Sequence, residues 1–237
     1  MCEEIRAFVA SAAEAFRLRG PVYRFVCGSA GDLQRRRVLP ESLGELGCVD
    51  VQVCDAAESP RLPFPDGAAR TALCFGTLEF AFEPQHFVAE MTRILAPGGA
   101  LLLATSPQPP EPKPMPGYWR LTPRSVERLL AGTSATIVGW RAVEAPPQRI
   151  YGIGFKPPGA AVTRGINCFL RDFQTRLDEL SPPRGRWQRL KRVLAPSKQT
   201  DGKLEFTVHL RVEHNCRHDL LKDHLDDQPT GGRIDLI

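Results

Sequence analysis

The sequence predicts an α/β layered fold whose sheet is mostly parallel. Segments with apolar residues at helical spacing alternate along the chain with short apolar segments that are typical of strands, and the turns between them are short. Residues 100–105, ALLLAT, are apolar throughout, as expected for a strand buried on both faces of a parallel sheet. The 237 residues, of which 42% are hydrophobic and 24% charged, fit one globular domain with a small extension.

The amino-terminal elements follow from hydrophobic spacing and from proline and glycine. Residues 2–18 place apolar side chains at helical spacing and end before Gly20-Pro21, which predicts an amphipathic helix. Residues 22–26 predict a short strand. Residues 49–55 alternate in polarity and predict a second strand that ends at an acid. LPFPDG at 62–67 predicts a turn by composition.

The middle of the chain continues the alternation. Residues 71–75 predict an apolar strand, and a helix begins at Pro84, a residue suited to the first helical position. We interpret Pro97-Gly98-Gly99 as structural, a helix stop and a hairpin-like reversal before the buried strand. Residues 107–116 are rich in proline and predict an irregular loop.

The carboxy-terminal part has its own start and stop signals. Thr122 predicts an N-cap for a helix that runs through Leu130, and residues 136–140 predict a further strand. Residues 169–180 predict a helix. Residues 204–212 alternate strictly between apolar and polar side chains, which predicts a one-sided antiparallel strand at an edge of the sheet.

We expect three parts along the chain. Residues 1–160 form the α/β domain, and residues 161–216 add a helix and an edge strand packed on the same domain. Residues 217–237 are polar and lack a convincing apolar face, so we expect a disordered tail.

Composition and charge limit the cellular setting. The net charge of +4 is too weak by itself to predict a specific nucleic-acid partner. Neither a secretory signal nor an apolar stretch long enough to cross a bilayer is present, which predicts a cytoplasmic protein. The seven scattered cysteines predict small apolar fillers rather than disulfides. Residues 184–194 are basic on one face, which is typical of a solvated helix, with peripheral membrane contact as the alternative.

Several stretches in one order resemble the class I S-adenosylmethionine-dependent methyltransferases, and in particular the methyltransferase type 11-like group. They are CDAAESPRLPFPDG, LCFGTLEF, HFVAEMTRILAPGGALLLATSP and GYWRLTP, the last being similar to the Y-W-R-F-T-P motif of one subgroup, and YGIGFK further on. The resemblance covers residues 20–156. It implies a doubly wound, mostly parallel Rossmann-like sheet with an antiparallel edge and helices on both faces, and S-adenosyl-L-methionine as cofactor.

The resemblance also implies where the site residues lie. In such sheets ligands bind at the carboxyl ends of the strands, which predicts the cofactor-binding residues Phe25, Cys27, Gly28, Ser29, Asp50, Asp55, Ala56, Phe75 and Gly76. Glu79 is the candidate catalytic proton acceptor. Tyr118, Trp119 and Arg120 are the candidate substrate-binding residues, with Trp119 packing the loop and Arg120 paired to a carboxylate.

The first motif departs from the family pattern of an acid followed by spaced glycines. Arg24 stands in place of the acid, while Val26 and Ala30 stand in place of two glycines. Phe80 stands where the family often has histidine. These departures keep two hypotheses open: a working methyltransferase, or an inactive relative that binds or regulates another protein.

The expected activity is transfer of a methyl group to an O or N nucleophile of a small molecule or a glycan precursor. A dinucleotide oxidoreductase is a weaker alternative, because the G-x-G-x-x-G fingerprint is missing after the first strand. His214, Cys216 and His218 would share a strand face, but their backbone sites would span ~13 Å, which is too far for one tetrahedral ion without a turn. We therefore predict no metal, and the oligomeric state stays open.

Overall fold

The computed structural model describes residues 3–26, 47–52, 61–107, 117–141, 149–157, 162–180, 204–210 and 233–236. Within these ranges the strands are β1 (Val22–Val26), β2 (Cys48–Gln52), β3 (Ala69–Phe75), β4 (Leu95–Thr105), β5 (Ala135–Arg141), β6 (Ile150–Phe155), β7 (Leu204–Leu210) and β8 (Arg233–Leu236). The helices are α1 (Glu3–Phe16), α4 (Pro84–Ile94), α5 (Pro123–Leu130) and α6 (Val162–Leu180), with a 3-10 turn η1 (Leu78–Phe80).

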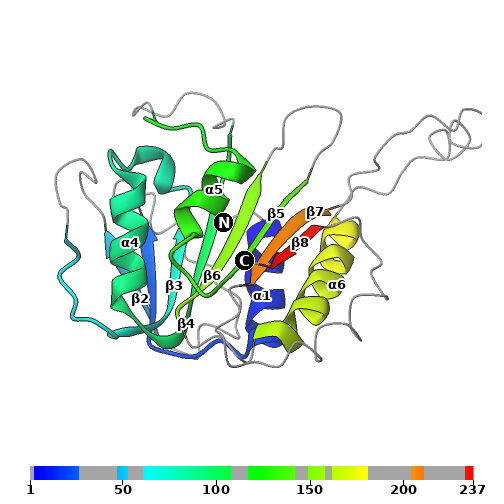
Figure 1. The fold of residues 1–237 in the computed structure, drawn as a ribbon, viewed down its shortest axis with the longest axis horizontal. Coiled ribbons are helices and arrows are strands. Elements are labelled where there is room, and N and C mark those ends of the chain that lie inside the picture. The colour runs from blue at the N-terminus through cyan, green and yellow to red at the C-terminus, as the bar shows by residue number, and fades with distance from the viewer. Residues whose placement is uncertain are drawn as a thin grey trace, which may run out of the picture.

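The strands form one eight-stranded sheet in the order β2-β1-β3-β4-β6-β5-β7-β8 (Figure 1). β2, β1, β3 and β4 are parallel to one another, and the pairings β4–β6, β6–β5 and β5–β7 are antiparallel. This arrangement confirms the predicted fold class. We call β2, β1, β3 and β4 the parallel half, and β6, β5 and β7 the antiparallel half.

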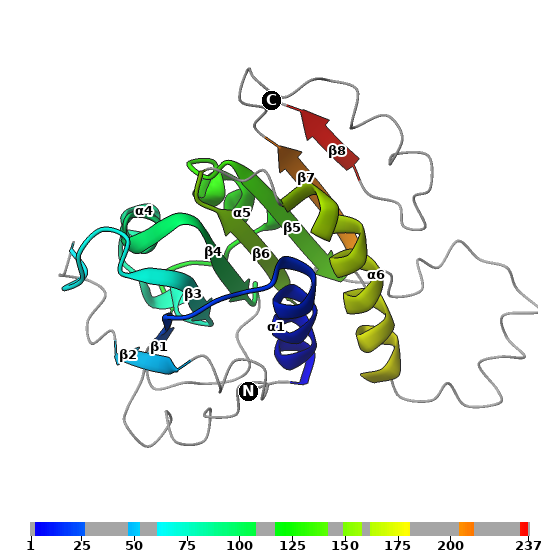
Figure 2. The same ribbon diagram turned by 90° about the horizontal axis from the view of Figure 1, so that it is seen from below.

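The helices cover both faces of the sheet (Figure 2). α1 and α6 pack on one face, where the rings of Phe8 and Phe173 lie 5.5 Å apart. α4 and α5 pack on the other face, against Leu101 and Leu103 of β4. β4 is buried from Ala100 to Thr105, as predicted for ALLLAT. Two helical layers around one sheet therefore bury both faces of its central strand.

Two sequence predictions about the sheet edge were wrong. Residues 204–209 of β7 alternate between buried and half-buried side chains as predicted, but the strand is not at the edge, because β8 pairs with it in parallel. β8 lies within residues 217–237, where the polar sequence predicted no regular element. Backbone pairing alone satisfies a strand's donors and acceptors, so it does not require an apolar pattern.

The interpretation of Pro97-Gly98-Gly99 as a reversal was also wrong. These residues lie inside β4, which begins at Leu95 directly after α4. The backbone is held there by Lys156, whose N–H donates to the Gly99 carbonyl and whose carbonyl accepts from Gly98. A Cβ on Gly99 would lie 2.8 Å from the Ala96 carbonyl oxygen. The glycine is thus needed for a close backbone approach rather than for a turn.

α5 begins and ends where the sequence predicted. Thr122 is the N-cap, and its hydroxyl accepts the backbone N–H of Ser125 at 3.2 Å. The helix lies directly on β6, since a Cβ on Gly152 would be only 2.8 Å from Cγ1 of Val126. α6, in contrast, begins seven residues before the predicted Phe169. None of the described helices is long and apolar enough to cross a membrane.

The LPFPDG turn is fixed by side chains of α4. Arg93 donates to the carbonyls of Leu62 and Phe64 and to the carboxylate of Asp66, at 3.2, 3.0 and 2.6 Å. Glu90 accepts the Leu62 N–H at 2.8 Å and also binds Arg93. The hydrogen bonds from Arg93 lower the pKa of Glu90, so its carboxylate stays charged at neutral pH. This ion pair holds the turn on the helix that follows it.

Candidate functional site

The carboxyl ends of β1, β3 and β4 are tied together by hydrogen bonds. The Thr77 hydroxyl, which is buried, donates to the Phe25 carbonyl at 3.1 Å and so joins the segment after β3 to β1. The N–H of Gly76 donates to the Ala104 carbonyl at 2.8 Å and joins it to β4. In parallel sheets ligands bind at this end of the strands. The three strand ends therefore form a fixed platform for a site.

Glu79 is the central polar group of this platform. Its side chain is buried, with the residue 5% exposed, and Oε1 accepts the backbone N–H of Ser106 at 2.9 Å. Its main-chain carbonyl accepts the N–H of Trp119 at 3.2 Å. Oε2 is buried and has no hydrogen-bond partner among the described residues. A buried carboxylate oxygen without a partner is rare in folded proteins, and it offers a position for a ligand donor or a proton.

Thr105, the last residue of β4, adds a second unused polar atom. Its hydroxyl oxygen is buried and finds no hydrogen-bond partner in the described part of the chain. It adjoins Ser106, whose N–H binds Glu79. Two polar atoms without partners thus lie at the carboxyl ends of neighbouring strands.

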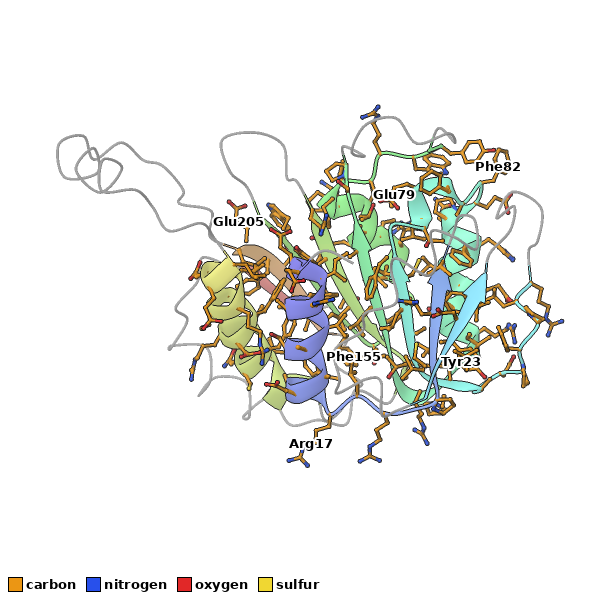
Figure 3. All side chains as sticks on the ribbon, turned by 180° about the vertical axis from the view of Figure 1, so that it is seen from behind. Arg17, Tyr23, Glu79, Phe82, Phe155 and Glu205 are labelled. Carbon is orange, nitrogen blue, oxygen red and sulfur yellow. The ribbon has the colours of Figure 1, made fainter. Side chains whose placement is uncertain are left out.

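An exposed aromatic surface, formed by Phe82, Tyr118 and Trp119, lies beside Glu79. All three side chains are about half exposed. The rings of Phe82 and Tyr118 meet edge to face with centroids 5.7 Å apart, and the Trp119 indole N–H donates to the Phe82 carbonyl at 3.2 Å. Figure 3 shows Glu79 and Phe82 at the same end of the sheet, with Arg17 at the other. Rings held in this way can contact a ligand without much loss of side-chain freedom.

Arg120 follows the aromatic surface and is exposed, without an ion pair to any described residue. The expected pairing with a carboxylate is therefore not seen within the described ranges. Its proposed contact with a substrate stays a prediction.

Arg24 and Asp50 form a two-pronged ion pair between β1 and β2. They lie directly opposite each other, with Nε to Oδ1 at 2.8 Å and Nη2 to Oδ2 at 2.7 Å. The Arg24 side chain is 4% exposed and that of Asp50 is 30% exposed. The guanidinium thus compensates the charge of the acid on the neighbouring strand. The Asp50 side chain stays partly exposed, and its role toward ribose hydroxyls stays a prediction.

Cys48 lies on the same face of β2 as Asp50, two residues away. Burial raises the pKa of its thiol to about 11. At pH 7 the neutral thiol is therefore the favoured form of Cys48.

The other predicted cofactor residues differ in burial, and five of them lie outside the described residues. Phe25 is fully buried in the core and packs edge to face against Phe87. Phe75 is half-buried at the end of β3, and Gly76 follows it with a φ of 62°. A Cβ on Gly76 would meet nothing within 4 Å, so open space adjoins this turn. The predictions that fall on Cys27, Gly28, Ser29, Asp55 and Ala56 lie outside the described residues.

Sequence reasoning did not single out Thr77, Phe82, Thr105 or Ser106. Thr105 carries a signal in retrospect, since it is the polar residue that ends an otherwise apolar strand. Thr77 and Ser106 act through contacts with distant residues, and no local pattern marks them.

The comparison with protein families decides the class of this site. Residues 26–103 match the model of a family described as a methyltransferase domain. Over this segment the chain is similar to a methyltransferase domain. The match begins at the end of β1 and ends within β4, so it spans Asp50, Gly76 and Glu79. It confirms the resemblance to class I methyltransferases and supports S-adenosyl-L-methionine as the cofactor.

Solved structures with similar folds include several methyltransferases. A possible histamine N-methyltransferase of Thermotoga maritima is 16% identical, with 65% of this chain and 91% of that chain covered and a TM-score of 0.41. A putative methyltransferase of Bacillus halodurans is 16% identical, with 63% and 98% covered and a TM-score of 0.44. The 1,6-didemethyltoxoflavin N1-methyltransferase of Burkholderia thailandensis is 16% identical, with 65% and 78% covered and a TM-score of 0.43. No curated protein matched the chain.

The described residues that match the methyltransferase family leave room for a ligand at the turn after β3, where a Cβ on Gly76 would meet no atom within 4 Å. Arg24, which replaces an acid of the family pattern, is turned to Asp50 on β2 rather than toward this turn.

Proposed function

We propose that the chain is a methyltransferase that transfers the methyl group of S-adenosyl-L-methionine to an O or N nucleophile of a small molecule or a glycan precursor. The observation that carries the proposal is the buried Oε2 of Glu79, which has no hydrogen-bond partner among the described residues. It lies at the carboxyl end of β3, inside the segment that matches the methyltransferase family.

The cofactor would be held on one side by Phe75 and Gly76, together with the predicted residues of the loops after β1 and β2. When bound, it supplies a sulfonium methyl group that is electrophilic enough to need little activation. The task of the chain is then to align the acceptor, to exclude water and to take a proton from the nucleophile.

Glu79 suits the last of these tasks. The N–H of Ser106 fixes Oε1, so the carboxyl group has one orientation and Oε2 stays free to accept an O–H or N–H. The aromatic surface beside it offers ring faces and edges to an acceptor with an apolar or sugar-like body. Both features support an acceptor that donates a hydrogen bond and has a nonpolar face.

The test separates proton transfer from cofactor binding. Methyl transfer from labelled cofactor into cell-extract fractions, separated into small molecules and lipid-linked or free glycans, is measured for the wild-type protein and for Glu79→Gln. Glutamine keeps the oxygen that accepts from Ser106 but cannot take a proton, so we expect activity to fall by ~10²–10⁴-fold. Calorimetry should detect S-adenosylhomocysteine binding to both proteins with similar affinity.

Glu83→Gln is the matched control, because it removes the same charge from an exposed position near Glu79 and should leave activity unchanged. Full activity in Glu79→Gln would contradict the role of Glu79. Absence of S-adenosylhomocysteine binding in folded wild-type protein would instead favour the inactive, regulatory relative.

A further inference from the structure

A cavity lies at the end of the sheet opposite Glu79. It has a volume of about 270 Å³ and is lined by α5, the segment that follows α5, and the adjoining ends of β5 and β7. We call it the basic groove; its lining residues are Arg124, Glu127, Arg128, Ala131, Thr133, Thr136 and His209. β5 begins beside Phe155, which Figure 3 places at the end of the sheet opposite Glu79. The groove is therefore separate from the proposed methyl-transfer site.

His209 is the unexplained group of the groove. Its side chain is 23% exposed, yet both ring nitrogens are buried and have no hydrogen-bond partner among the described residues. Nε2 lies 3.9 Å from Oε1 of Glu127, which is too long for a hydrogen bond. A buried imidazole with neither nitrogen bonded is unfavourable, so an occupant that accepts from it would stabilise the groove.

The threonines do not provide the missing partners. The hydroxyls of Thr133 and Thr136 lie 3.0 Å apart, and each lies within hydrogen-bond distance of the Leu130 carbonyl, at 2.8 and 3.3 Å, so both have partners within the protein. The unused donors of the groove are therefore the imidazole and the two guanidinium groups.

The charges of the lining favour an anion over a cation. Arg124 and Arg128 are four residues apart on α5, so they lie on the same side of the helix, and both are exposed without an ion pair to a described residue. Among the described residues that line the groove, Glu127 is the one carboxylate. A metal ion would face two guanidinium groups, and the described residues contain no group of three or more potential metal ligands.

We propose that the basic groove binds the anionic group of a small molecule, a phosphate or a carboxylate. Arg124 and Arg128 present planar donors that match two oxygens of such a group. His209 donates an N–H from the wall formed by β7. The volume exceeds that of a lone phosphate and leaves room for the body of a small metabolite.

The experiment uses the full chain and inorganic phosphate, with acetate as the carboxylate probe and chloride at equal ionic strength as the reference. The C–H resonances of His209 are assigned with His209→Gln and followed by NMR. We expect a saturable shift with phosphate or acetate but not with chloride. The double variant Arg124→Gln/Arg128→Gln should weaken binding at least tenfold, whereas Arg61→Gln/Arg171→Gln, which removes the same charge elsewhere, should not.

Several results would overturn the proposal: a shift that does not saturate, an equal shift with chloride, or unchanged affinity in the Arg124/Arg128 double variant. A response of His209 to Zn²⁺ but not to phosphate or acetate would replace the anion site with a metal site. If the double variant is unfolded, Glu127→Gln provides the second test, because removing the carboxylate should tighten phosphate binding. Calorimetry with S-adenosylhomocysteine should be unaffected throughout, so this proposal and the proposed methyl transfer can fail independently.

Discussion

The two halves of the sheet treat their buried polar groups differently. In the antiparallel half, the buried hydroxyls of Thr133, Ser134 and Thr136 all bond to carbonyls of α5, β5 or β6. In the parallel half, buried polar atoms of Glu79 and Thr105 have no partner among the described residues. In the antiparallel half, the ring nitrogens of His209 at the basic groove are the described exception.

The difference distinguishes a structural role from a binding role. A buried polar group that is fully bonded contributes to a unique packing, whereas one that is left unbonded costs stability unless a ligand completes it. In the parallel half, the unbonded atoms of Glu79 and Thr105 lie at the carboxyl ends of β3 and β4, where α/β sheets bind ligands. Substitutions in the two halves should therefore affect stability for different reasons.

The largest effect is expected at the ion pair of the parallel half. Asp50→Ala removes the carboxylate from beside the buried guanidinium of Arg24 and should lower the free energy of unfolding by ~2–3 kcal/mol. This loss is smaller than the usual cost of breaking a fully buried ion pair, because the Asp50 side chain is 30% exposed. Arg24→Met replaces the charge with an apolar chain of similar length and should cost less. Urea unfolding of both variants gives the comparison, and a larger loss in Arg24→Met would contradict it.

The next effect tests the packing of the antiparallel half. Gly152→Ala would place a Cβ 2.8 Å from Val126 Cγ1 and 3.1 Å from Leu130 Cδ1, so α5 must shift on β6. We expect a loss of about 1–3 kcal/mol in the free energy of unfolding. Gly132→Ala is the control, since its Cβ would meet no atom within 4 Å. Equal thermal midpoints for the two variants would show that α5 is not packed closely on this strand.

The sequence predicted those elements that local signals define. Thr122, Pro123 and the apolar positions Val126 and Leu130 located α5 at both ends, because capping and helical spacing are properties of neighbouring residues. The β8 pairing and the course of Pro97-Gly98-Gly99 depend on contacts with distant strands, which no local pattern encodes. Contacts with distant strands therefore determine the structure of these two segments.

The sequence predicted where the candidate site lies, but it did not predict which groups its side chains bind. The order of strands placed Gly76 and Glu79 at the carboxyl end of the sheet, and the structure has them there. The partner of Arg24 could not be predicted, because it requires the register that sets Arg24 opposite Asp50. Likewise, the free Oε2 of Glu79 follows from the position of Ser106, 27 residues further on.

Two buried threonines of the parallel half differ in whether their hydroxyl groups are bonded. Thr77→Val removes a buried hydroxyl that donates to the Phe25 carbonyl and should cost ~1–2 kcal/mol, because the carbonyl loses its donor. Thr105→Val removes a hydroxyl without a partner and should leave stability equal or higher. Chemical denaturation measures both, and calorimetry with S-adenosylhomocysteine adds the second readout. A clear loss of stability in Thr105→Val would mean that its hydroxyl is bonded in the folded chain.

The smallest effect concerns acid stability of the LPFPDG turn. Hydrogen bonds from Arg93 lower the pKa of Glu90 in the folded chain, so the carboxylate contributes stability above its unfolded pKa of about 4.3. That contribution is lost as pH falls through the lowered folded value, because protonation then breaks the bonds that Arg93 and Leu62 donate. In urea titrations between pH 7 and pH 3, Glu90→Gln should start less stable and lose less on acidification than the wild type. Parallel curves for the two proteins would mean that Glu90 is not the acid-sensitive contact that holds this turn against α4.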